Sequence, residues 1–196
     1  MGCLVIDDLA GRGGRLTALE AGLRSGGVRL RRFEDDGAGD LHGHLQEALL
    51  AARGSGGADI LAVGAGCGAA LALAAQLPVD RLALLELPAE HSGTPAGRAL
   101  RRRVAPVERF ARRNMALCVS QVLLIAPDNA PQRHRLARMA RALTNARVTR
   151  AFLRGDGESG LCTNCENALE KALIGFFSGA DLQKSLAQNS EMCIIV

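Results

Sequence analysis

Residues 60–76 have the sequence "ILAVGAGCGAALALAAQ", in which an apolar run meets several glycines and continues as an Ala/Leu-rich segment. A short apolar run that ends in glycine predicts a buried strand, and the segment after it predicts a helix. The stretch therefore predicts a strand, a tight turn and a helix. Several chemistries use such a turn, and each needs a particular residue type in it.

The same alternation of strand-like and helix-like segments continues along the chain. We expect strands at 3–6, 28–33, 59–64, 81–87, 121–127 and 147–153, and helices at 15–27, 41–54, 68–77, 131–146 and 165–179. This order predicts an α/β fold with a doubly wound, mostly parallel six-stranded sheet and helices on both faces. Residues 1–180 are expected to form one domain with a helical insertion at about 88–118. Residues 181–196 are expected to form a short helix and a loose tail.

Composition narrows the classes of function. The chain has 196 residues, of which 48% are hydrophobic, and no apolar stretch approaches the roughly 20 residues of a membrane span. No basic segment precedes the first strand, so we expect a cytoplasmic protein without a membrane partner. Arginine is concentrated in 98–113 and 133–154. No aromatic residue that could stack on bases lies between the arginines of 133–150. A nucleic-acid partner is therefore not expected.

The six cysteines have irregular spacing, and only "CTNC" at 162–165 has the spacing of a motif. A single C-x-x-C pair without a second pair of ligands is a weak indication of a metal or redox site. We expect reduced thiols, no metal site and no cofactor.

The glycine-rich turn is compatible with nucleotide binding. "GAGCGA" at 64–69 fits the pattern G-x-G-x-x-[GA], and Glu86 follows at the distance of a ribose-binding acid. The turn also resembles the first motif of adenosylmethionine-dependent methyltransferases, although Ala62 stands where that family has an acid. In both alternatives Gly64, Gly66 and Gly68 would approach the ligand. Two α/β units precede this turn, whereas the dinucleotide-binding fold normally opens with it.

The whole chain, from about residue 3 to 178, resembles the α/β-hydrolase superfamily. The segments that carry the resemblance, in chain order, are "CLVIDDLAGRGG" (3–14), "LAVGAGCGAALALA" (61–74), "QVLLIAPDNAP" (121–131) and "RVTRAFLRGDGES" (147–159). The resemblance implies that these segments correspond to the oxyanion loop, the nucleophile elbow, the loop of the catalytic acid and the loop of the catalytic histidine.

The resemblance also implies where the reactive side chains should be. Aligning "GAGCG" with G-x-S-x-G places Gly66 at the nucleophile, and a shift by one residue places Cys67 there. Asp128 corresponds to the acid, although an aspartate there is equally typical of a helix cap or turn. No histidine follows the last strand, and among the four histidines only His91 lies on a loop at the carboxyl edge. Asp8, with its acidic neighbour at position 7, replaces the His-Gly of the oxyanion loop.

We therefore predict an α/β-hydrolase-fold protein that is catalytically impaired and binds a small apolar ligand or a protein partner. The expected ligand-binding residues are Asp8, Leu9, Gly66, Gly68 and Glu86. One alternative is an active ester or thioester hydrolase with Cys67 as nucleophile, supported by Asp128 and His91. The other is an adenosylmethionine- or nucleotide-binding protein.

Overall fold

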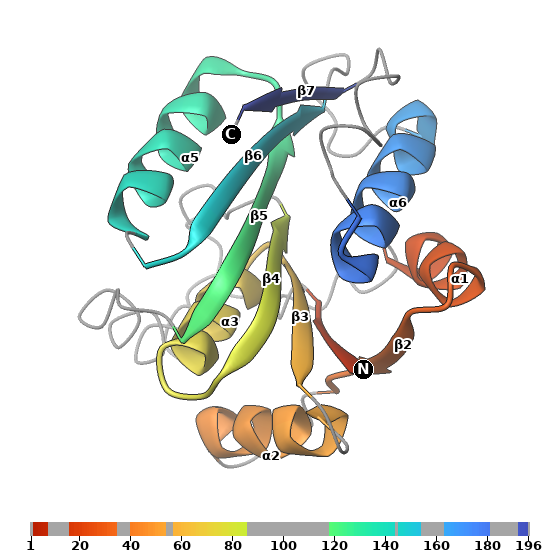
Figure 1. Ribbon diagram of the computed structural model, residues 1–196, viewed down its shortest axis with the longest axis vertical. Helices are drawn as coiled ribbons and strands as arrows, with labels where there is room; N and C mark the ends of the chain where they lie inside the picture. The colour runs from red at the N-terminus through yellow and green to blue at the C-terminus, as the bar shows by residue number, and fades with distance from the viewer. Residues whose placement is uncertain are drawn as a thin grey trace, which may run out of the picture.

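The computed structural model (Figure 1) describes residues 2–7, 16–34, 40–53, 57–85, 118–143, 145–153, 163–180 and 192–195. The strands are β1 (Gly2–Ile6), β2 (Arg29–Arg32), β3 (Ala58–Val63), β4 (Val79–Leu85), β5 (Val119–Pro127), β6 (Arg147–Leu153) and β7 (Met192–Ile195). The helices are α1 (Thr17–Ser25), α2 (Leu41–Arg53), α3 (Gly66–Ala74), α5 (Ala130–Ala142) and α6 (Thr163–Ser178).

The strands form one seven-stranded sheet in the order β2-β1-β3-β4-β5-β6-β7. Every neighbouring pair from β2 to β6 is parallel, and β7 pairs antiparallel with β6. The carboxyl ends of six strands therefore share one edge. The strand order reverses between β1 and β3, and in sheets of this kind the crevice at such a reversal is where ligands bind.

Two apolar clusters cover the two faces of the sheet. One lies between the sheet and α1 and α6, and the other between the sheet and α2, α3 and α5. All six residues of β3 are buried, as expected for a strand covered on both faces. These observations confirm the predicted doubly wound parallel sheet with helices on both sides (Figure 1).

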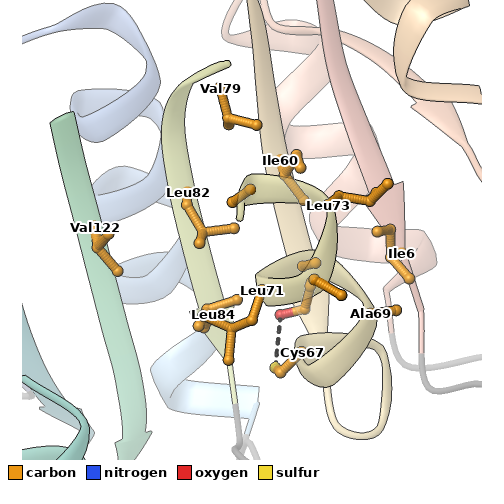
Figure 2. Packing of buried hydrophobic residues seen from close by; sticks show 14 of the residues in the cluster. Ile6, Ile60, Cys67, Ala69, Leu71, Leu73, Val79, Leu82, Leu84 and Val122 are labelled. Carbon is orange, nitrogen blue, oxygen red and sulfur yellow. Dashed lines mark hydrogen bonds between the residues drawn. The ribbon is translucent and has the colours of Figure 1, made fainter. Parts of the chain in front are cut away.

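Helix α3 is buried on almost every side, because small residues let it approach the sheet closely. Its eight buried residues are Gly66, Cys67, Ala69, Ala70, Leu71, Ala72, Leu73 and Ala74. Figure 2 shows this helix packed against apolar side chains of β1, β3 and β4. A helix that is apolar all round belongs in the interior, so the turn before α3 is fixed by packing on several sides.

Two features differ from the sequence prediction. Helix α3 begins at Gly66, two residues earlier than expected. Residues 192–195, which were predicted to lie in a loose tail, form β7 and pair with 150–153 of β6. The pairing covers backbone groups of β6 that would otherwise form a sheet edge. Local sequence patterns do not predict this pairing, because the two strands are far apart in the chain. The predicted insertion at 88–118 lies outside the described residues, apart from Cys118.

No helix among the described segments is long and apolar enough to cross a membrane.

Candidate functional site

The turn between β3 and α3 is made at Gly64. This residue follows β3 directly and has φ of 54°, the left-handed region that favours glycine. Its N–H donates to the Leu85 carbonyl at 3.0 Å, and its carbonyl accepts from the Cys67 N–H at 3.2 Å. Ala65 already has right-handed helical angles, with φ of −64° and ψ of −24°. Gly64 is therefore the apex at which the strand turns into the helix.

If the turn is compared with the elbow that the sequence resembles, this apex is a third candidate for the nucleophile position. An elbow exposes its nucleophile because the residue sits on a sharp, strained turn, and such strain falls on a left-handed residue. Ala62 and Gly66, two residues to either side of Gly64, supply the small flanks that an elbow needs. The registers based on Gly66 and Cys67 place the nucleophile position two or three residues later, inside α3. The apex itself carries no side chain.

Gly66 brings the start of α3 against the end of β1. A Cβ atom at this position would lie 2.6 Å from the Ile6 carbonyl oxygen and 2.7 Å from that of Asp7. Because both obstacles are backbone atoms, only glycine fits here. The loop after β1 therefore begins directly beside the elbow, at the point where the strand order reverses.

The Cys67 side chain lies in the core. The residue is 1% exposed, and its Sγ lies 3.3 Å from the Leu85 carbonyl oxygen and 3.5 Å from that of Ala62. Figure 2 shows the thiol at the first turn of α3 among buried side chains that include Leu84. Both carbonyl oxygens can accept a hydrogen bond from the thiol, which is turned away from solvent.

Asp128 follows β5 at the same edge and forms an ion pair with Arg133. The Arg133 Nε donates to Oδ1 at 2.5 Å and Nη2 donates to Oδ2 at 2.8 Å, while the guanidinium lies 5.3 Å from the Phe152 ring centroid. The side chain of the next residue, Asn129, caps α5 by accepting from the Gln132 N–H at 3.0 Å. The carboxylate that the sequence assigned to a cap or a catalytic acid is therefore held by an arginine.

A charged cluster at the ends of β1 and β2 was missed by sequence reasoning. The Arg32 guanidinium contacts the Asp7 carboxylate and also lies 3.7 Å from Glu20 Oε1. The side chains of Asp7 and Glu20 are only 12% and 11% exposed. The negative charge of Asp7, which alone would repel an anion at this edge, is thus offset by Arg32. The sequence showed only an alternating edge strand around Arg32.

The structure places some of the predicted site residues close together and others apart. Gly66 and Gly68 lie in the first turn of α3, and Cys67 lies between them with its thiol turned into the core. Asp128 lies two strands away, after β5. The other predicted residues, Asp8, Leu9, Glu86 and His91, lie outside the described residues. Within the described part of the chain no three His, Cys, Asp or Glu side chains form a cluster that could hold a metal ion.

Comparisons with known proteins show a likeness of fold. No protein-family model matches the sequence, and no curated protein matches it. Among solved structures the chain is similar to an α/β hydrolase from Sphaerobacter thermophilus DSM 20745, with a TM-score of 0.55 and 15% sequence identity. The match covers 90% of this chain and 92% of that one. At this identity the likeness concerns the fold, and it agrees with the family resemblance seen in the sequence.

Proposed function

Because the chain has an α/β-hydrolase-like fold with a glycine at the apex of its elbow, we propose that it is a non-catalytic binding protein of the cytoplasm. Its ligand is a small apolar molecule or a protein partner, held at the carboxyl edge of the sheet between the ends of β1 and β3. The single observation that carries the proposal is the left-handed conformation of Gly64. In a working elbow the attacking side chain would occupy this position.

The surroundings of the apex support the loss of catalysis. Nucleophilic catalysis needs an attacking atom within reach of a base, and glycine offers no such atom. Cys67 directs its thiol to two carbonyl oxygens in the core, and Asp128 is paired with Arg133. The fold supports binding instead. Gly64 is half-buried and lies where the strand order reverses, which is where ligands bind in sheets of this kind.

Hydrolysis of p-nitrophenyl acetate and of acetyl thiocholine tests the absence of catalysis. The purified protein should release product no faster than buffer does, and Cys67→Ala should behave in the same way. A rate above the buffer blank that disappears in Cys67→Ala would contradict the proposal and favour the hydrolase alternative.

Binding is tested with a series of short fatty acids by calorimetry and thermal shift. Gly64→Asn should weaken the binding of any fatty acid that raises the melting temperature of the wild type, because the asparagine side chain occupies the apex. Asparagine is chosen because it tolerates the left-handed region. Gly27→Asn is the matched control, because Gly27 is also left-handed, with φ of 85°, and a Cβ there meets nothing within 4 Å. If the two variants bind the fatty acid with equal affinity, the apex is not part of the ligand site.

Alkylation separates the proposal from the hydrolase alternative. Iodoacetamide at neutral pH should modify Cys118, which is exposed, well before Cys67, as followed by peptide mass spectrometry. Labelling of Cys67 as fast as Cys118 in the native protein would indicate an accessible thiolate. The nucleotide and adenosylmethionine alternative stays a prediction, and calorimetry without heat at millimolar ligand would exclude it.

A further inference from the structure

A buried carboxyl group lies at the opposite edge of the sheet from the elbow. Asp59, the second residue of β3, is 3% exposed, and its Oδ1 has no hydrogen-bond partner among the described residues. It is aligned with Cys3 of β1 on one side and lies beside Arg81 of β4 on the other. A carboxylate with one unsatisfied oxygen in such a place is costly, because burial disfavours the charged form.

Arg81 joins this carboxyl group to the end of α6. Its Nη1 donates a hydrogen bond to the Phe177 carbonyl and also lies 3.8 Å from Asp59 Oδ2. Phe177 is in the last turn of α6, where carbonyl groups lack helical partners and the helix dipole favours a cation. The Arg81 guanidinium therefore faces two acceptors, the Asp59 carboxylate and the Phe177 carbonyl. Only the carboxylate can change its charge, by taking up a proton.

The charged groups around Asp59 act in opposite directions. Burial, the largest cause, and Asp80 raise the pKa of Asp59, whereas Arg81, the hydrogen bond from the Arg81 backbone and the charge of the amino terminus lower it; the net result is a pKa of about 6. Burial also raises the pKa of the Cys3 thiol, so that β1 presents a neutral side chain. From α6 the Phe177 carbonyl accepts a hydrogen bond from Arg81.

We propose that Asp59 and Arg81 form a proton-controlled latch on the carboxyl-terminal end of α6. When Asp59 is charged, it competes with the Phe177 carbonyl for the Arg81 guanidinium. When Asp59 is protonated, Arg81 holds the end of α6 alone. Acidification therefore tightens the attachment of this helix to β4.

The sign and size of the effect follow from proton linkage. A carboxyl group with a raised pKa in the folded protein favours folding as pH falls, and this contribution is lost as pH rises through about 6. With a pKa of 3.8 in the unfolded chain and about 6 in the folded chain, the folding constant rises about 30-fold between pH 8 and pH 4.5. Other carboxylates also titrate in this range, so the effect must be measured against a variant.

Denaturant unfolding of the wild type and Asp59→Asn at pH 4.5 and pH 8 provides the first test. The ratio of their folding constants should change by about 30-fold between the two pH values, with Asp59→Asn the more stable variant at pH 8. Asp80→Asn is the matched control, since it removes the neighbouring acid: the pH dependence should remain, with its midpoint moved to lower pH. A ratio that does not change with pH overturns the proposal.

Hydrogen exchange tests the latch itself. The Gly179 and Ala180 amides donate to the Phe176 and Gly175 carbonyls at the end of α6. Their protection factors, corrected for intrinsic exchange, should increase in the wild type as pH falls from 7.5 to 5. Arg81→Gln should give low protection that does not depend on pH, and it keeps the test decisive if Asp59→Asn does not fold. Protection that is unaffected by both pH and Arg81→Gln overturns the proposal.

Discussion

Replacing Gly66 by alanine tests the close approach of α3 to β1. The added Cβ would lie 2.6 Å and 2.7 Å from the Ile6 and Asp7 carbonyl oxygens and 2.9 Å from Ile6 Cγ2. Two of these three atoms belong to the backbone of a central strand and the residue after it, so neither can rotate away. The helix or the strand must move by several tenths of an ångström, against packing on both sides.

The size of the loss follows from this crowding. Inserting one extra carbon into a well-packed core costs typically about 1–3 kcal/mol. An alanine in place of glycine recovers at most about 1 kcal/mol of helix propensity, and less at the first helical residue. At this chain length each 1 kcal/mol lowers the melting temperature by roughly 2–4 °C. We therefore expect Gly66→Ala to melt below the wild type, by up to roughly 12 °C.

Calorimetry and urea unfolding measure this loss, and Gly43→Ala in the first turn of α2 is the matched control. A Cβ at Gly43 meets only the Asp40 side chain, at 3.1 Å, which can rotate. The control should be neutral or slightly stabilising, because alanine has the higher helix propensity. If Gly66→Ala is as stable as Gly43→Ala, the approach of α3 to β1 is not as close as the distances state.

Three further predictions concern other parts of the fold. Asn129→Ala removes the cap of α5 and should destabilise the protein by about 1 kcal/mol in urea unfolding, whereas Asn129→Ser should restore most of the loss. Phe152→Ala, at a β6 position that is 1% exposed, should cost about 3–5 kcal/mol, with Phe152→Leu much milder; equal losses would mean that the ring is not packed in the core. Deleting 192–196 removes β7 and should cause self-association, seen by light scattering, because the edge of β6 becomes free; a monodisperse monomer would contradict this.

The fold could be predicted from the sequence because its signals are local. β6 occupies the predicted residues 147–153, and β1, β3 and α5 lie within a few residues of their predicted bounds. Strands buried on both faces give continuous apolar runs, and glycines and charges mark where they end. The order of these segments then restricts the sheet to parallel crossovers.

The site was harder to predict because backbone angles and long-range contacts define it. Three glycines occur within five residues of the turn, and only the φ of Gly64 shows which of them is the apex. Arg32 and Asp7 are 25 residues apart in the chain, so their contact has no local signal. Strand β7 was missed for the same reason, since its pairing partner is β6, about 40 residues earlier.

The strand order has a consequence for how the chain is assembled. From β4 to β6 each strand lies next to the one synthesised just before it, so a nascent chain can extend its sheet in one direction as it emerges from the ribosome. β1 must wait for its second neighbour, β3, which follows it by some 50 residues. Until β3 is available, β1 and β2 form a two-stranded ribbon, which is too small to persist in water. Residues 58–63 therefore complete the first three-stranded part of the sheet.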